Sequence, residues 1–409
     1  MPRRYWLETL GCPKNDVDSA KLVGTLECDG LIPATEPEDA DLLVVNTCAF
    51  IEAAREESIE TVLALAGARR PGAQVVVTGC LAERYGDELA RAMPEVDRVA
   101  GFGVPVSLSA PAVPSLDLLN LRRPPATAPW AYVKVAEGCD RACGFCAIPS
   151  FRGRQRSRTE EAVLDEVEAL GVREVVLVAQ DLASYGRDLG RAGAIIGLIE
   201  RVGDLVDRTR LLYLYPSELG DGLVDAICAT GVPYFDLSLQ HVSRPLLRRM
   251  RRWGDGERFA RRIADIRARE PSAAFRSSFI VGYPGETEGD HDRLMEFLSE
   301  VRLDWAGLFA YSEEEGTYAA GLDQRVPPGL VAERLAELSE LQDRITASRR
   351  AELVGETIEV LVDRVGVGRS HREAPEIDGV VGLPHDLPAG DLVDVVVTGS
   401  AGPDLEATP

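Results

Sequence analysis

Residues 137–158 read Glu-Gly-Cys-Asp-Arg-Ala-Cys-Gly-Phe-Cys-Ala-Ile-Pro-Ser-Phe-Arg-Gly-Arg-Gln-Arg-Ser-Arg, which places Cys139, Cys143 and Cys146 in one loop at a C-x3-C-x2-C spacing. An iron–sulfur cluster normally takes four cysteine ligands, so three thiols from one loop would leave one iron without a protein ligand. Catalytic metal sites keep such an open position for a substrate or cofactor. The alternatives are a zinc loop or a disulfide pair, but zinc motifs usually come as paired C-x2-C arms and no second arm lies nearby. We therefore interpret this loop as a cofactor site.

The composition is that of a globular chain with two or three domains. It has 409 residues, of which 45% are hydrophobic and 27% charged. The first residues lack the apolar core of a signal peptide and no apolar run is long enough to span a bilayer, so we expect a cytoplasmic protein without membrane contact. Eight cysteines in such a chain indicate metal binding or redox chemistry rather than structural disulfides.

The charge is strongly acidic, with a formal net charge of -22. Such a surface repels nucleic acid, whose binding depends on neutralising phosphates. It suits a basic protein partner, whose encounter it would accelerate. Charge alone leaves open whether the acidity only aids solubility.

The first hundred residues alternate short apolar runs with helical patterns, which predicts a parallel α/β sheet. We expect strands at residues 5–10, 41–45 and 74–78, and helices at 17–28, 53–65 and 83–91.

A second set of three cysteines follows these strands. Cys12, Cys48 and Cys80 each come after the end of one expected strand. Ligands bind at the carboxyl ends of strands in open α/β sheets, so the strand order predicts a second three-cysteine site. The alternative is three unrelated buried cysteines. Cys28 and Cys228 lie in helical patterns, and we interpret them as packing residues.

The rest of the chain divides into three parts. Residues 104–130 carry six prolines and read as a linker over the surface. From 131 to 348 the βα alternation resumes and predicts an incomplete (β/α)6 barrel. We expect its strands at 132–135, 174–179, 211–215, 234–239, 275–281 and 305–310, and helices at 160–170 and 245–269. Residues 349–409 predict a small antiparallel β-barrel, with strands at 357–362, 379–383 and 392–398.

Charged and polar residues of these parts carry further expectations. Polar residues at the strand ends, among them Gln180, Asp181, Gln240 and His241, should ring the mouth that faces the cysteine loop. The arginine-rich stretch at 245–269 is interpreted as a solvated face. Residues 352–409 of the C-terminal barrel include twelve acidic and three basic residues, a poor surface for RNA.

Taken together, these stretches resemble the methylthiotransferases, a family of radical S-adenosylmethionine (SAM) enzymes, over nearly the whole chain. Several motifs resemble the branch that modifies small-subunit ribosomal protein S-twelve. They are Leu10-Gly-Cys-Pro-Lys-Asn15, Asn46-Thr-Cys-Ala-Phe-Ile51, Glu137-Gly-Cys-Asp-Arg141, Ala147-Ile-Pro149, Ala179-Gln-Asp181 and Glu373-Ala-Pro-Glu-Ile-Asp-Gly379.

The resemblance implies an N-terminal domain at 1–103, a linker at 104–130, a radical SAM barrel at 131–348 and a TRAM domain at 349–409. It also implies two 4Fe-4S clusters. One, bound by Cys139, Cys143 and Cys146, would cleave SAM, and an auxiliary cluster would be bound by Cys12, Cys48 and Cys80. Phe145 and Gln180 match positions near SAM in similar enzymes, whereas no catalytic side chain is assigned.

The activity implied by this resemblance is addition of a methylthio group to the β-carbon of an aspartate in ribosomal protein S-twelve. An electron donor such as flavodoxin or ferredoxin would be a second partner. The alternative substrate is a tRNA adenosine, which the acidic C-terminal barrel disfavours. A different class of function, a non-catalytic electron carrier with two clusters, is harder to reconcile with polar strand ends around one cluster.

Overall fold

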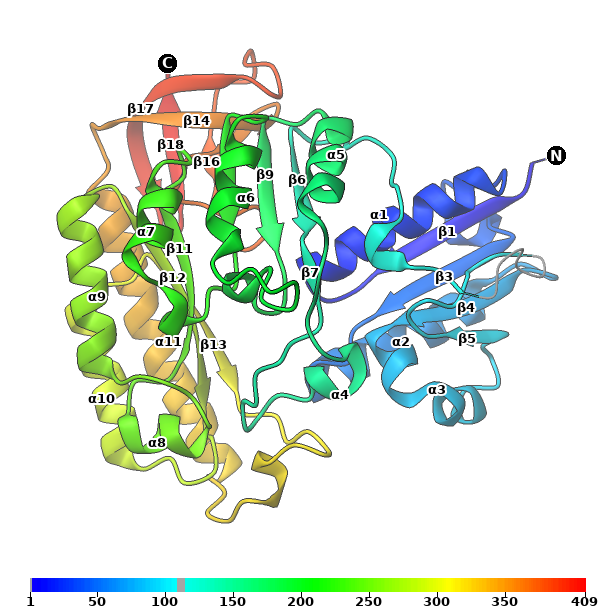
Figure 1. Cartoon of the computed structure of the whole chain (residues 1–409), viewed down its shortest axis with the longest axis horizontal. Coiled ribbons are helices and arrows are strands. Elements are labelled where there is room, and N and C mark those ends of the chain that lie inside the picture. The colour runs from blue at the N-terminus through cyan, green and yellow to red at the C-terminus, as the bar shows by residue number, and fades with distance from the viewer. Residues whose placement is uncertain (1, 109–114) are drawn as a thin grey trace.

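The computed structural model describes residues 2–108 and 115–409 (Figure 1). Its N-terminal part is a five-stranded parallel sheet in the order β2-β1-β3-β4-β5. The middle strand is buried along its whole length, because helices cover both faces of a parallel sheet. The strands are β1 (Arg4–Thr9), β2 (Ile32–Pro33), β3 (Leu42–Thr47), β4 (Gln74–Gly79) and β5 (Arg98–Ala100), and the helices are α1 (Pro13–Cys28), α2 (Glu52–Ala68) and α3 (Cys80–Ala92).

These elements confirm the three strands and three helices expected from the sequence. The two edge strands were not expected, because two or three residues are too few to show a period. Cys28 was interpreted as a packing residue, and that interpretation is wrong, because the last turn of α1 leaves it exposed.

The central part is an open barrel of six strands, as expected, in two parallel sheets. A single bridge between Leu214 and Leu237 joins the sheets β10-β9-β6 and β11-β12-β13. The strands are β6 (Trp130–Lys134), β9 (Glu174–Val178), β10 (Arg208–Leu211), β11 (Tyr234–Gln240), β12 (Ala274–Val281) and β13 (Trp305–Ala310).

The third strand of this barrel was expected at 211–215, but the strand observed there, β10, spans Arg208–Leu211 and ends where the expected strand would begin. Tyr213 takes a positive φ of 66°, which breaks the strand geometry. Its backbone N–H donates to the Asp236 carboxylate at 2.9 Å instead of to a neighbouring strand.

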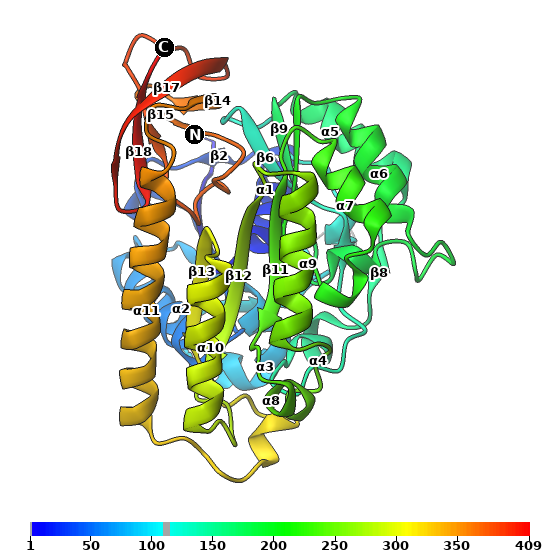
Figure 2. The same ribbon diagram turned by 90° about the vertical axis from the view of Figure 1, so that its left-hand side faces the viewer.

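Helices cover the outer face of the barrel (Figure 2). They are α5 (Glu160–Leu170), α6 (Ala194–Gly203), α7 (Asp221–Cys228), α8 (Arg244–Arg249), α9 (Gly256–Arg269), α10 (Glu288–Val301) and α11 (Pro328–Ala351). The single helix expected at 245–269 is two helices, because Arg251 and Gly254 have positive φ values of 55° and 107°. Asp255 then starts α9 by accepting a hydrogen bond from the Arg258 backbone at 3.0 Å.

The arginines of this stretch are not simply a solvated face. Arg252 is 9% exposed, and Arg249 donates to the Pro284 carbonyl at 2.8 Å. The expectation of a solvated face is therefore wrong for these two residues.

The C-terminal part is a closed barrel in the order β14-β15-β16-β18-β17. Its pairs are antiparallel, as expected, except that β16 and β18 run parallel. The strands are β14 (Thr357–Arg364), β15 (Val367–Arg369), β16 (Val381–Gly382), β17 (Leu392–Ala401) and β18 (Asp404–Thr408).

The segment between β15 and β16 closes the amino-terminal end of the central barrel (Figure 1). Side chains from three barrel strands donate hydrogen bonds to it: Tyr132 to the Pro375 carbonyl, Tyr234 to Asp378 and Trp305 to the Arg372 carbonyl, at 2.9, 2.6 and 2.7 Å. Its Ala374 joins the apolar cluster that fills the inside of the barrel. The motif at 373–379 therefore forms a floor for the barrel.

The N-terminal part packs against the central barrel at several places, one of which is helix α1 against β6. Helix α4 (Ile148–Arg152), just after the Cys139 loop, buries Phe151 in the N-terminal core. Close to Phe151, which also contacts Arg84, Glu314 after β13 is buried and forms ion pairs with Arg55 of α2 and with Arg84 of α3, the latter at 2.7 Å. Within residues 2–108 and 115–409, no helix is both long and apolar enough to cross a membrane.

Candidate functional site

The first three cysteines emerge at one edge of the N-terminal sheet. Cys12 precedes α1 directly, Cys48 follows β3, and Cys80 is the first residue of α3 after β4. Since β1, β3 and β4 are neighbours in the sheet, the three thiols meet at their carboxyl ends. The strand order therefore places them together as expected.

The thiols of this first set lie close to one another, with Cys48 and Cys80 buried and Cys12 half-buried. Gly11 has a φ of 104°, and a Cβ added there would lie 3.0 Å from the Cys48 sulfur, so only glycine leaves it room. Burial raises the pKa of Cys48 to about 12, and the charges of Cys12 and Cys80 add to that rise. A bound metal cation would favour the thiolate instead.

The second three cysteines lie in the loop after the two-residue strand β7 (Ala136–Glu137), which pairs with β8 (Arg156–Ser157). Backbone hydrogen bonds hold the middle of this loop, from Gly144 N–H to the Met250 carbonyl at 2.8 Å and from Ala319 N–H to the Gly144 carbonyl at 2.7 Å. Burial raises the pKa of Cys146 to about 12, and the charges of the other two thiols add to it.

Each set has an arginine that donates to a sulfur. Arg252 lies 3.3 Å from the Cys143 sulfur, and Arg152 lies 3.0 Å from the Cys80 sulfur. A positively charged hydrogen-bond donor favours the thiolate, which is the form of cysteine that binds iron. Among the described residues, no three His, Cys, Asp or Glu side chains are close enough to share one metal ion. In a cluster each thiolate binds its own iron, so the donors of both sets fit that group.

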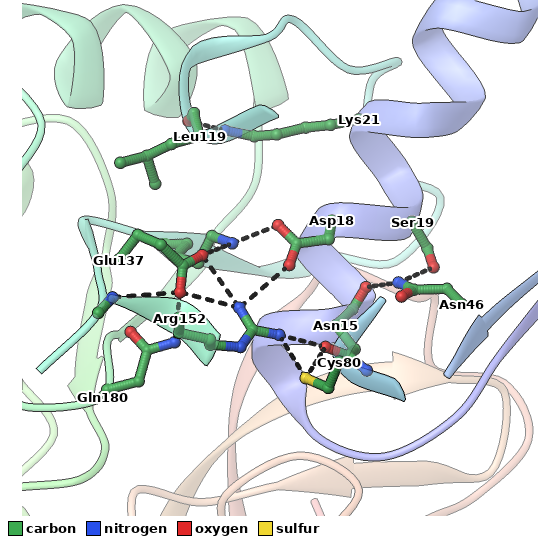
Figure 3. Close-up of polar contacts among 12 residues, drawn as sticks. Asn15, Asp18, Ser19, Lys21, Asn46, Cys80, Leu119, Glu137, Arg152 and Gln180 are labelled. Atoms are coloured by element: carbon green, nitrogen blue, oxygen red, sulfur yellow. Dashed lines mark hydrogen bonds and ion pairs between the residues drawn. The ribbon is translucent and has the colours of Figure 1, made fainter. Parts of the chain in front are cut away.

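A buried polar network joins the two sets (Figure 3). One terminal guanidinium nitrogen of Arg152 donates to the Cys80 sulfur, and the other pairs at 2.9 Å with Glu137, which lies two residues before Cys139 in the sequence. Burial would raise the pKa of Glu137, but Arg152 and Lys134 outweigh it and hold that pKa well below its usual range. The loop with the second set is thereby tied to a thiol of the first.

The two residues expected near SAM lie on the loop side of the barrel. Gln180 follows β9 and donates to Glu137 at 2.7 Å, while its side-chain oxygen has no partner among the described residues. Phe145 is half-buried against the barrel core. Both positions adjoin the second thiol set, and their contact with SAM stays a prediction.

One residue expected at the barrel mouth faces elsewhere. His241 is fully buried, and its Nδ1 accepts a hydrogen bond from the Ser243 backbone at 3.0 Å. Burial lowers its pKa to about 4. It is a packed neutral histidine, because the chain turns outward after Gln240, whose φ is 70°.

The sequence reasoning missed Arg152, Arg252 and Lys14. The two arginines lie in arginine-rich stretches, where charge runs usually indicate a solvated surface. Lys14 is 8% exposed in the first turn of α1, a polar stretch with no apolar period to indicate burial. For Arg152 and Lys14, proximity to the cysteine motifs in the sequence was the signal that could have found them, whereas Arg252 lies 109 positions from Cys143 and offered no such signal.

Three family descriptions match successive parts of the chain. Residues 4–101 match the Uncharacterized protein family UPF0004, residues 133–298 the Radical SAM superfamily and residues 354–409 the TRAM domain. The match to the radical SAM superfamily covers the second thiol set, and the first match covers the other.

Curated relatives align over the full length. A protein of Kineococcus radiotolerans is 42% identical over 100% of this chain and 97% of its own length. Relatives from Nocardioides sp. and Salinispora tropica are 42% and 43% identical, over 98% and 100% of this chain and 96% and 95% of their own lengths. All three are named ribosomal protein uS12 methylthiotransferase RimO.

Among solved structures, the radical SAM methyltransferase TsrM from Kitasatospora setae, with cobalamin and a 4Fe-4S cluster bound, has a TM-score of 0.52 to this chain. It is 16% identical and covers 78% of this chain and 74% of its own. The likeness shows a common fold.

Proposed function

This chain belongs to the RimO family of radical SAM methylthiotransferases, and we propose that it adds a methylthio group to the β-carbon of an aspartate side chain in ribosomal protein uS12. The observation that carries the proposal is the pair of three-thiol sets joined through Arg152. One set would serve radical generation and the other sulfur insertion. We propose that residues 1–103 form the sulfur-inserting domain and residues 131–348 the radical-generating barrel, with a linker at 104–130 between them. Residues 349–409 would form a separate TRAM domain.

The proposed cofactors are two 4Fe-4S clusters and SAM. Cys139, Cys143 and Cys146 would hold the SAM-binding cluster, and the auxiliary cluster would be held by Cys12, Cys48 and Cys80. Once bound, these groups supply the radical chemistry that removes a hydrogen atom from an unactivated C–H bond, and the sulfur that replaces it. Phe145 and Gln180 would contact SAM.

The protein's own residues would hold these groups in register. Arg152 and Arg252 donate to the cysteine sulfurs, which favours the thiolates. The floor formed by residues 373–379 packs Ala374 against the apolar cluster at the amino-terminal end of the barrel. A fixed distance between the two sets brings the reacting groups together, which is the protein's main contribution to rate.

The C-terminal barrel supports a basic protein partner over tRNA. Within residues 352–409, all of which the structure describes, the exposed basic residue is Arg364. The exposed acidic residues are Glu352, Glu356, Glu359, Glu376, Asp386, Asp391, Asp394 and Glu406. Such a surface attracts a basic ribosomal protein and repels a phosphate backbone. We further propose flavodoxin or ferredoxin as the electron donor, and the cytoplasm as the location.

The test is anaerobic reconstitution with iron and sulfide, followed by incubation with a reductant, SAM and either purified uS12 or bulk tRNA. We expect mass spectrometry to find one methylthio group on an aspartate of uS12 and none on tRNA. Binding of uS12 should weaken as salt rises, because ionic attraction is screened. A methylthiolated nucleoside with unmodified uS12 would contradict the proposal.

A further inference from the structure

Lys14 stands out among the lysines of this chain. Only three of its 45 basic residues are lysine, namely Lys14, Lys21 and Lys134, and all three are buried. Arginine therefore supplies every exposed cation of the described chain. A lysine ammonium is a compact charge with three donors, which suits a narrow buried site.

Two of the three lysines have evident partners. Lys21 donates to the Leu119 carbonyl and pairs with Glu166 at 3.3 Å. Lys134 pairs with Asp18 and with Glu137, the latter at 2.7 Å. Both stabilise the joint between the N-terminal part and the barrel.

The ammonium group of Lys14 has no hydrogen bond or ion pair within residues 2–108 and 115–409. Its contact is with the ring of Tyr213, whose centroid lies 3.3 Å from the ammonium nitrogen. A cation over an aromatic face is attracted only modestly, whereas an unpaired buried ammonium is costly. An anion brought by a ligand would offset that cost.

The position of Lys14 is inside the barrel, next to the first thiol set. Tyr213 belongs to the apolar cluster that fills the inside of the barrel together with Tyr132 and Trp305. Lys14 lies two residues from Cys12 in the sequence. It therefore lies where the inside of the barrel meets the N-terminal part.

Two polar residues of neighbouring barrel strands are not fully buried. On β12 the inward Ser278 stays partly exposed, and so does Ser238 on β11, whereas their neighbours Phe279 and Leu237 are buried in the outer core. The anionic group that acts most strongly on Lys14 is Cys12, followed by Asp236, which accepts from the Tyr213 backbone, and by Glu137, which is held by Arg152. Neither carboxylate lies within ion-pair distance of Lys14.

We propose that Lys14 binds the carboxylate of the aspartate that is to be modified and thereby selects this residue as the substrate. The inference rests on the proposed function. An ion pair there would hold the β-carbon beside the thiol set that begins at Cys12, and it would reject an uncharged side chain. Lys14 acts in this account as a binding and specificity residue, and it transfers no proton.

The test compares wild type, Lys14→Met and Lys14→Arg with uS12 that carries either the native aspartate or asparagine at the modified position. We expect wild type to prefer aspartate by roughly 10- to 100-fold in kcat/KM, the range of a hydrogen bond to a charged group. Lys14→Met should reduce the preference to about one by raising KM for the aspartate substrate, and Lys14→Arg should keep part of it.

Iron content and SAM cleavage without uS12 are measured for every variant, so that loss of a cluster is recognised. An unchanged aspartate preference in Lys14→Met, or activity that falls only in step with iron, would assign Lys14 to cluster support and overturn the proposal. If the variants do not fold, wild type alone decides, because equal binding of aspartate and asparagine uS12 also overturns it. Wild type that leaves uS12 unmodified would instead refute the proposed function itself.

Discussion

The Arg152 side chain touches both halves of the candidate site. It donates to the Cys80 sulfur at 3.0 Å and to Asn15 at 2.7 Å, and it pairs with Glu137 at 2.9 Å. Its side chain is 3% exposed. Removing its charge would leave Glu137 and Asp18 short of a cation in a buried place, and this is the costly way to break a buried ion pair.

We predict that Arg152→Met lowers the free energy of unfolding by about 3 to 5 kcal/mol. The reconstituted variant should also bind less iron, because the Cys80 thiolate loses its donor. Urea unfolding and iron analysis measure the two effects. The matched control is Arg154→Met, whose side chain is 91% exposed and whose loss should change stability by less than about 0.5 kcal/mol. Equal stability of the two variants would show that the buried network contributes nothing.

At the scale of elements, the Cys139 loop depends on the short β7–β8 hairpin that carries it. Gly138 has a φ of 78°, and a Cβ there would collide with the backbone carbonyl of Arg154. Gly153, in the same hairpin, has a similar φ of 73° but open space around it. A comparison of alanine substitutions at the two glycines therefore distinguishes the effect of backbone strain from that of a steric clash.

We predict that Gly138→Ala disturbs the second thiol set and that Gly153→Ala does not. Both changes carry the strain of a positive φ, about 1 to 3 kcal/mol. Only Gly138→Ala must also push the hairpin apart, which displaces Glu137 and Cys139. Iron content and SAM cleavage after reconstitution should fall in Gly138→Ala and stay near wild type in Gly153→Ala. Parallel losses in both variants would mean that strain alone disturbs the loop.

At the scale of the whole molecule, the two thiol sets come from two parts of the chain that share a packed joint. One set lies on three loops of the parallel sheet and the other on one loop of the barrel. We therefore expect each set to bind its group when the cysteines of the other are removed, because its ligands come from one part of the chain.

We predict that changing Cys12, Cys48 and Cys80 together to alanine removes about half of the bound iron. SAM cleavage should persist, because the second set is intact, whereas methylthiolated product should disappear. Alanine at Cys139, Cys143 and Cys146 should abolish both activities. Iron analysis and chromatography of both products, on protein reconstituted without oxygen, measure this. Wild-type product formation by the first triple variant would remove that set from the sulfur-inserting role.

The sequence by itself determined the architecture and the two cysteine sets. Short β-branched runs bounded by turns predict β3 and β4, and Cys48 and Cys80 follow them directly. These signals are local, because a strand's side-chain period and its end are written in neighbouring residues. The acidity of the C-terminal barrel is likewise a matter of composition.

Only the tertiary structure decided which charges are buried and what they meet. Arg152 reaches Cys80 across 72 positions of the chain, and residues 373–379 close a barrel whose first strand begins at Trp130. Lys14 is left without a partner because β10 stops early and Tyr213 turns inward beneath it. The free energy of a buried charge depends on groups that are near in space and distant in sequence, so no local pattern could have revealed it.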